Sequence, residues 1–119
     1  LGPQLKYSSC LYKAPGDGIA EAAVLMRYEM QVRPETSRSP AWAEAQWQKI
    51  ARALSALEDR WMSHLSGPLD MGQIAIGCAL GYLDLRHAGR DWRADCPDLA
   101  AWYAGFAARP AMQTTAPAA

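Results

Sequence analysis

The sequence predicts an all-α helical bundle, and three observations indicate this fold class. Apolar residues recur at steps of three and four along residues 47–65, no stretch alternates polar and apolar residues as a half-buried strand does, and residues 71–83 carry no charge. The uncharged stretch, thirteen residues within "LDMGQIAIGCALGYLDLR", is too short to cross a hydrocarbon core of ~30 Å. Because Ala and Gly are poor strand formers, we expect a helix that other helices cover on all sides.

The composition limits the possible partners. The 119 residues suffice for one domain with a single core. Twelve basic residues balance twelve acidic ones, so the chain lacks the clustered positive charge that nucleic acid or an anionic membrane requires. No signal peptide or membrane span is recognisable in these residues, and none is expected. Three cysteines without a short pairing motif favour a reducing, cytoplasmic compartment, and Cys78 fits a small buried hydrophobe.

The first 16 residues are predicted to be an irregular arm or the end of a linker. Gly, Pro and Ser punctuate them, and "PGDG" at residues 15–18, a turn signal, spans the boundary with the next segment. The helical domain is therefore expected over residues 17–119. Its first helix is predicted from Asp17, a plausible N-cap, to Val32, because Pro34 restricts the residue before it and ends the helix.

A polar surface loop, "PETSRSP", leads to a second helix predicted over residues 40–65. Ser39 is the expected N-cap, and Pro40 suits the first helical position. One apolar stripe runs along this helix and predicts its buried face: Trp47, Ile50, Leu54, Leu57, Trp61 and Leu65.

The uncharged stretch is predicted to form the third helix, over residues 71–86. Asp70 is the expected cap, and Gln73 three residues later would complete a capping box. A fourth helix is expected from Pro97 to Ala108, followed by a short turn over residues 112–115 and a tail rich in Ala and Pro.

No residue pattern indicates self-sufficient catalysis. His64 and His87 lack Cys or carboxylate neighbours at metal-ligand spacing, so no metal site is expected. The sequence has no nucleophile elbow, no phosphate-binding glycine loop and no paired-carboxylate motif. Taken alone, the residues predict a helical bundle without catalytic machinery.

The motifs in their order resemble the C-terminal domain of a bacterial, cytosolic glutathione S-transferase. The resemblance runs from Asp17 to about Pro117, through "DGIAEA", "RP", "IARALSALE", the capped "LDMGQIAIGCALGYLDLR" and "CPDLAAWYAGFAARPAMQTTAP". Two departures accompany it. First, the family usually has Ser or Thr as the cap and Asp at the third helical position, where this sequence has Asp70 and Gln73; these residues can make the same capping hydrogen bonds. Second, residues 1–16 do not match the family pattern.

The resemblance implies a role as the helical half of a larger protein. Family members carry an N-terminal thioredoxin-like domain that binds most of the co-substrate glutathione and activates its thiol, and no such pattern is present in this sequence. The helical domain would line the pocket for a small hydrophobic electrophile and help to form a homodimer. The chain alone is therefore expected to be inactive, with no catalytic residue of its own.

The resemblance also implies positions for binding residues. Glu21 matches an acidic residue that reaches across the dimer towards the γ-glutamyl amine of the partner's glutathione, although the usual residue is Asp. Met26, Arg27 and Gln31 lie further along the same helix, where the family lines its electrophile pocket. The simpler interpretations are a solvated acid for Glu21 and a surface ion pair for Arg27.

Two alternatives remain open at the level of sequence. Related helical domains act as non-catalytic protein-interaction modules, and the same scaffold supports other glutathione-dependent reactions, such as isomerisation, dehalogenation or thiol–disulfide exchange. The sequence does not identify the electrophile or the residue that activates the glutathione thiol.

Overall fold

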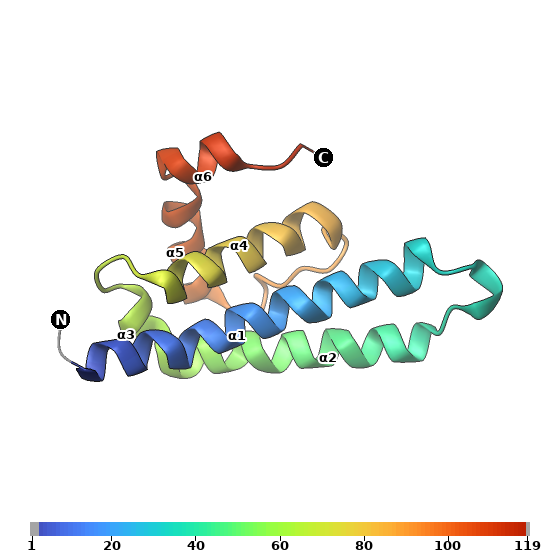
Figure 1. The fold of residues 1–119 in the computed structure, drawn as a ribbon, viewed down its shortest axis with the longest axis horizontal. Helices are drawn as coiled ribbons and strands as arrows, with labels where there is room; N and C mark the ends of the chain where they lie inside the picture. The colour runs from blue at the N-terminus through green and yellow to red at the C-terminus, as the bar shows by residue number, and fades with distance from the viewer. Residues whose placement is uncertain (1–2, 119) are drawn as a thin grey trace.

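The computed structural model describes residues 3–118, with side chains described from residue 13, and no strand occurs among them. The predicted all-α fold class is confirmed (Figure 1). The elements in chain order are α1 (Pro3–Arg27), η1 (Tyr28–Val32), η2 (Glu35–Ser37), α2 (Pro40–Ala56), η3 (Leu57–Trp61), α3 (Met62–Leu65), α4 (Met71–Arg86), α5 (Pro97–Ala107) and α6 (Pro110–Thr115).

The helices pack around one core. In Figure 1, α1 lies between α2, to which it is antiparallel, and α4, which runs along its other side. Helix α5 crosses near the start of α4 and contacts α3 and η3 as well, and α6 lies beyond α4. The principal axes of the molecule measure 52 × 28 × 25 Å, because the α1–α2 hairpin extends past the other helices. The largest fully buried side chains come from every long helix: Ile19, Ile50, Leu57, Leu65, Ile76, Leu80, Leu83, Leu99 and Cys96.

The prediction of an irregular arm over residues 1–16 is wrong where the structure describes that segment. Helix α1 begins at Pro3 and passes without a break through Pro15 and the "PGDG" turn signal. Asp17 is therefore not an N-cap; it is exposed within the helix and forms an ion pair with Lys13 at 3.0 Å. Residues 1–2 lie outside the described part of the chain.

Packing against α4 explains why the helix persists there. A Cβ atom on Gly16 would lie 2.9 Å from the carbonyl carbon of Ala75 and from the backbone nitrogen of Ile76, so the two helix backbones are in contact at this point. Proline inside a helix costs about 3 kcal/mol or more, and the local turn signal alone would end the helix. The long contact of α1 with α4 outweighs that cost, which is a tertiary effect that a local pattern does not report.

Each long helix of the hairpin contains one π turn. Where η1 ends, the N–H of Arg33 donates to the carbonyl of Tyr28, five residues earlier, at 2.9 Å. The second π turn, η3, continues α2 and leads into α3. The predicted helix ends at residues 32 and 65 are confirmed, since the helical backbone is continuous through both π turns.

The predicted helix starts at Pro40 and Met71 are also confirmed. The hydroxyl of Ser39 accepts a hydrogen bond from the N–H of Trp42 at 3.2 Å. At α4, Asp70 Oδ1 accepts from the N–H of Gln73 at 3.0 Å, and the Gln73 amide donates to the carbonyls of Gly67 and Pro68 at 3.0 and 2.7 Å. The cap thus ties the start of α4 to the preceding loop.

The C-terminal part differs in one respect from the prediction. Helix α5 ends at Ala107, close to the expected end, but the predicted turn over residues 112–115 belongs to a helix, α6, that begins at Pro110. Proline at the first position of a helix is favourable, and the hydroxyls of Thr114 and Thr115 donate back to the carbonyls of Pro110 and Ala111.

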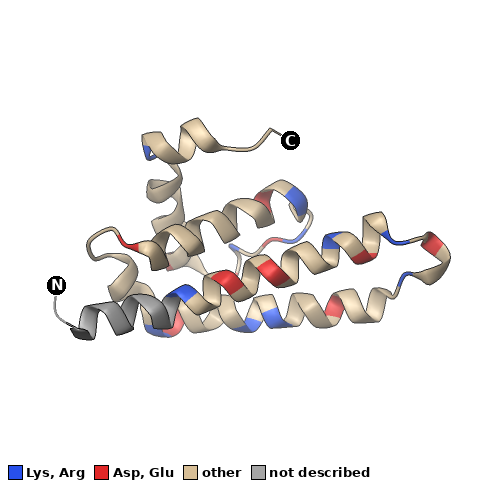
Figure 2. Ribbon diagram, viewed as in Figure 1, with Lys and Arg blue, Asp and Glu red and all other residues tan. Residues whose placement is uncertain are grey.

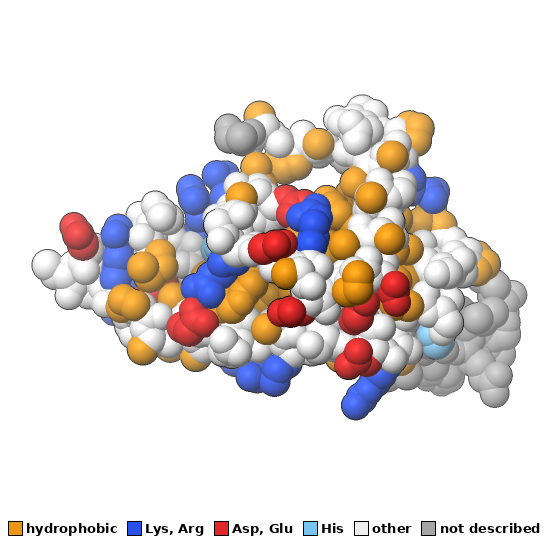
Figure 3. All heavy atoms as spheres, turned by 180° about the vertical axis from the view of Figure 1, so that it is seen from behind, with side chains coloured by type: hydrophobic (Ala, Val, Ile, Leu, Met, Phe, Trp, Pro, Cys, Tyr) orange, Lys and Arg blue, Asp and Glu red, His pale blue; other side chains and the backbone are white. Residues whose placement is uncertain are grey.

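Charged side chains are distributed unevenly over the helices. In Figure 2, acidic and basic residues both occur along α2 and along the part of α1 that is not grey, whereas most of α4 and α6 carries neither. The view from behind in Figure 3 also mixes acidic, basic and hydrophobic side chains, so no single-sign patch covers that face. Among the described residues, no helix is both long and apolar enough to cross a membrane.

Candidate functional site

Glu21 lies on the outer side of the α1–α2 pair, away from the core. Its side chain is exposed and lines a groove of about 290 Å³ between the two helices, together with Gln46 and Lys49 of α2. The carboxylate therefore faces outwards, where a second molecule can reach it.

The structure separates the three residues that were expected to line an electrophile pocket. Met26 is only 4% exposed and packs in the core, so it offers little surface in this chain, and its place in a pocket wall stays a prediction. Arg27 is half-buried and Gln31 is exposed, one turn apart on the same side of the hairpin arm. The helical face that carries Arg27 and Gln31 differs from the face that carries Met26, because residues one position apart point about 100° apart around a helix.

An exposed apolar surface near the tip of the hairpin was not predicted. Leu25, Tyr28, Val32 and Trp42 are between 39% and 64% exposed, and all four line a groove of about 390 Å³. Leu25 lines both this groove and the groove that contains Glu21, so the two grooves adjoin at this residue. The sequence signal was present as the spacing of residues 21, 25, 28 and 32, which places them on one side of a helix.

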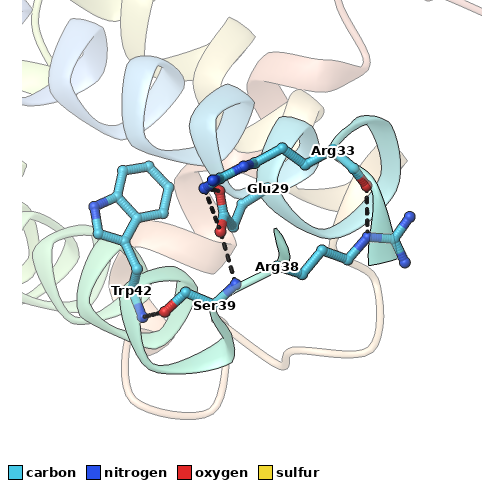
Figure 4. A network of polar contacts seen from close by, with 5 residues as sticks. All are labelled: Glu29, Arg33, Arg38, Ser39 and Trp42. Carbon is cyan, nitrogen blue, oxygen red and sulfur yellow. Dashed lines mark hydrogen bonds and ion pairs between the residues drawn. The ribbon is translucent and has the colours of Figure 1, made fainter. Parts of the chain in front are cut away.

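A buried carboxylate holds the hairpin tip together (Figure 4). Glu29 accepts a hydrogen bond from the backbone N–H of Ser39 at 2.7 Å and contacts Arg33 at 3.1 Å through both of its oxygens. These bonds, the one from Ser39 first, lower the pKa of Glu29. The guanidinium of Arg38 completes the network by donating to the carbonyl of Arg33 at 2.9 Å. Glu29 thus connects the end of α1 to the residue that caps α2.

A second polar cluster fixes the connection between α4 and α5. Asp84 accepts from both Nη atoms of Arg93 at 2.7 Å and from the indole of Trp92 at 3.0 Å. Burial alone would raise the pKa of Asp84, but the hydrogen bonds from Arg93 and Trp92 outweigh burial and lower it. The Arg93 guanidinium also lies over the Trp92 ring, 4.5 Å from its centroid. Asp84 is therefore a positioning residue for this loop.

Helix α5 is capped by a side chain from a distant part of the chain. The two oxygens of Glu58, in η3, accept from the backbone N–H groups of Asp98 and Leu99 at 2.9 and 2.8 Å. The residue at the N-cap position, Cys96, makes no side-chain cap. Burial, with a smaller contribution from Glu58, raises the pKa of Cys96 to about 11, so its thiol is neutral at physiological pH.

No metal centre or catalytic cluster is found in the part of the chain that the structure describes. No group of three His, Cys, Asp or Glu side chains there could hold a metal ion. The imidazole of His87 bonds to the carbonyl of Ala23 in α1 at 2.9 Å, which is a structural contact.

The comparisons with known proteins agree with this fold. A family model of the glutathione S-transferase C-terminal domain matches residues 40–105. The fold class is thus the all-α domain of a glutathione transferase. This chain belongs to the glutathione S-transferase family, as its C-terminal helical domain.

Several relatives of known structure are similar over the whole chain. A glutathione transferase family member from Pseudomonas fluorescens Pf-5, solved with S-(propanoic acid)-glutathione, is 39% identical with a TM-score of 0.95, and the match covers 100% of this chain and 60% of that one. A glutathione S-transferase from Methylobacillus flagellatus KT with bound glutathione is 31% identical with a TM-score of 0.89, over 99% of this chain and 59% of that one.

The chain is also similar to a curated protein of Escherichia coli K12, the uncharacterized GST-like protein YibF. The two are 31% identical over 107 residues, which make up 88% of this chain and 52% of the relative. The chain therefore spans about half the length of that relative and about 60% of the two solved relatives.

Proposed function

We propose that this chain is the helical half of a transferase that joins the thiol of glutathione to small apolar electrophiles. The observation that carries the proposal is the P. fluorescens structure, which matches this chain over its whole length and holds a glutathione with a substituent on sulfur. Two free cysteines in the described part of the chain are consistent with a reducing, cytoplasmic compartment, which belongs to this proposal.

In the proposed protein, this chain binds and positions, and the other domain supplies thiol activation. A thioredoxin-like domain would hold most of the glutathione and lower the pKa of its thiol. Arg27 and Gln31, which reach the surface of the hairpin arm, are the residues of this chain that we assign to the electrophile pocket. Orientation of two reactants in one site is a large part of such catalysis, and a helical wall contributes to it.

Turnover by the complete protein tests this function. We expect the complete protein to conjugate glutathione to a chromogenic aromatic electrophile, and this chain alone to remain at the buffer rate, because we assign thiol activation to the other domain. Conjugation by the rigorously purified chain would contradict the assignment of roles. Glutathione binding without conjugation would favour another glutathione-dependent reaction, and absence of binding would favour a non-catalytic interaction module.

A homodimer through the outer side of the α1–α2 pair is part of the proposal. This side carries the exposed apolar residues near the tip, and Glu21 and Lys49 farther along it. A two-fold interface uses the same surface on both copies, so a surface with both an acidic and a basic side chain can be complementary to itself. The same arrangement would bring Glu21 towards the partner's glutathione.

Glu21→Gln in the complete protein is expected to weaken glutathione binding about ten- to a hundredfold. A hydrogen bond between charged groups contributes about 1.5–3 kcal/mol, and the amide retains the size of the side chain but not its charge. Folding stability should change little, because Glu21 is exposed. Calorimetric titration of both proteins with glutathione measures the effect.

Glu35→Gln is the matched control, since Glu35 is also an exposed acid of the hairpin but lies in the tip loop. It should bind glutathione like the wild type. Equal glutathione affinities for the wild type and Glu21→Gln would contradict the proposed contact, and Glu21 would be a solvent-exposed acid of the helix.

A further inference from the structure

Arg27 is a half-buried arginine with no counter-ion among the described residues. Three of the described arginines are half-buried, and two of them have partners: Arg38 donates to the carbonyl of Arg33 at 2.9 Å, and Arg90 donates to Glu44 at 2.8 Å. Arg27 forms no hydrogen bond and no ion pair with any residue that the structure describes. A guanidinium is always charged, and charges removed from water are normally paired, so this side chain is suited to bind an anion from outside the chain.

Arg27 lies beside the C-terminal end of α4. Positions 16, 20, 23 and 27 follow one another by four, three and four residues, which places them on one side of α1. Gly16 packs against the backbone of α4, and the carbonyl of Ala23 accepts a hydrogen bond from Nε2 of His87, the residue directly after α4, at 2.9 Å. The two helices run in the same direction (Figure 1). Arg27, one turn beyond Ala23, is therefore at the junction of the two helix ends.

The nearest acidic residues along the two helices already have partners. Glu29, two residues after Arg27, is held by the network at the hairpin tip, and both oxygens of Asp84, in the last turn of α4, accept from Arg93. The last turn of α4 also contains a second basic side chain, Arg86. The positions one turn before and one turn after Arg27 hold uncharged residues: Ala23, Val24, Met30 and Gln31. The charge that remains unbalanced at this junction is therefore positive.

The surface of α4 that adjoins the junction is uncovered and largely apolar. The sequence predicted that other helices cover α4 on all sides, which is wrong within this chain, because Cys78 is exposed and Tyr82 and Leu85 are only partly buried. These residues are four and three positions apart and form one stripe of the helix. The ring of Tyr82 lies edge-on to that of His87, with 6.2 Å between the ring centroids, so the stripe reaches the junction with Arg27.

We propose that Arg27 binds a carboxylate of the electrophile, so that the preferred substrate is a small molecule with one carboxylate on an otherwise apolar body. The inference rests on the proposed function, whose supporting P. fluorescens structure holds a glutathione with a propanoic acid group on sulfur. The guanidinium takes the carboxylate through two parallel N–H···O bonds. The apolar body lies against the ring of Tyr82. Arg27 thereby orients the substrate for attack and determines which electrophiles are preferred.

The carboxylate takes no part in the bond changes. With a chloroarene as the electrophile, the glutathione thiol first loses its proton, and the thiolate sulfur donates an electron pair to the carbon that carries chlorine. A carbon–sulfur bond forms, and the carbon–chlorine bond breaks with both of its electrons leaving on chloride. One glutathione and one chloroarene thus give one conjugate, one chloride ion and one proton, and no oxidant or reductant is required.

A matched pair of electrophiles tests the proposal in the complete protein. para-Chloro-dinitrobenzoate carries a carboxylate, and its amide has the same shape without the charge. Arg27→Gln should lower the ratio of kcat/KM for the acid to kcat/KM for the amide by about ten- to a hundredfold, as expected for the loss of a charged hydrogen-bonded pair. The different intrinsic reactivities of the two compounds cancel, because every protein is measured with the same pair. Arg27→Lys retains the charge without the planar fork and should lower the ratio less.

Arg60→Gln is the matched control for charge. Arg60 is exposed and lies in η3, at the opposite end of the hairpin from its tip, and the substitution removes the same charge. It should leave the ratio unchanged. An unchanged ratio in Arg27→Gln would overturn the proposal, and the stem of Arg27 would then merely cover apolar surface. Equal slowing of both electrophiles also leaves the ratio unchanged; it would overturn the proposal and assign Arg27 to glutathione.

Binding of dinitrobenzoate separates this inference from the proposed function. This compound lacks the chlorine and cannot be conjugated, and calorimetry without glutathione should show that the wild type binds it about tenfold or more tightly than Arg27→Gln does. Equal binding, or no binding by the wild type, would overturn the inference. If the wild type conjugates neither chloroarene, the proposed function is refuted, and dinitrobenzoate still decides whether Arg27 binds the anion. If the wild type conjugates the amide and Arg27→Gln leaves the ratio unchanged, the proposed function stands and the inference fails.

Discussion

Gly16→Ala is expected to lower the free energy of unfolding by about 1–3 kcal/mol relative to Gly18→Ala. Both positions lie in α1, so alanine brings the same gain in helix propensity, roughly 1 kcal/mol, at each. Only at Gly16 would the new methyl group meet the backbone of α4, at 2.9 Å, whereas nothing lies within 4 Å of a Cβ atom on Gly18. Backbone atoms of a packed helix cannot rotate away, so the helices must move apart.

The difference is measured as the shift in the midpoint of urea unfolding at unchanged slope. Gly18→Ala serves as the control and should be neutral or stabilising. If both variants unfold at the same midpoint, α1 and α4 do not approach as closely as described. Packing against α4 would then not explain why α1 continues through Pro15.

Glu58→Ala is expected to lower the free energy of unfolding by roughly 1.5–3 kcal/mol. The substitution removes a carboxylate that accepts from the N–H groups of both Asp98 and Leu99 at the start of α5. It also removes a negative charge from a helix N-terminus, where such charge is favourable. Glu58→Gln retains one acceptor oxygen and should lower the free energy of unfolding by less than Glu58→Ala.

Glu44→Ala is the matched control for this prediction. It also removes a glutamate of the same long helical segment, but its ion pair with Arg90, at 2.8 Å, is on the surface, and such pairs contribute about 0–1 kcal/mol. Equal unfolding midpoints for Glu58→Ala and Glu44→Ala would show that the cap of α5 does not contribute to stability.

Helix starts and stops were predictable where the signal is local. Ser39 with Pro40, and Asp70 with Gln73, are combinations that satisfy the first N–H groups of a helix from within a few residues, and the structure has helices at both places. The "PGDG" segment is also a local signal, but Gly16 there serves close packing of two helices. Glycine is favoured both in turns and where two helices pack closely, so the sequence alone does not distinguish these two roles for Gly16.

The contacts between distant segments could not be predicted. Nothing near Glu58 indicates that its carboxylate caps a helix 40 residues later, and nothing near Ala23 indicates that its carbonyl bonds to His87. For the candidate site, the outward position of Glu21 followed from resemblance and agrees with its exposure. The burial of Met26 was not predicted, because neighbouring positions on a helix point about 100° apart and only tertiary contacts decide which of them faces the core.

The π turn at η3 has a consequence for the comparison of related sequences. A π turn takes up one residue more than an α turn, so it accommodates an inserted residue without disturbing the helix on either side. A relative with an uninterrupted α-helix in this place would align correctly with α2 and α3 only through a single-residue gap within residues 57–61. An ungapped alignment would instead rotate every later position of the helix by about 100° and pair core residues of one protein with surface residues of the other.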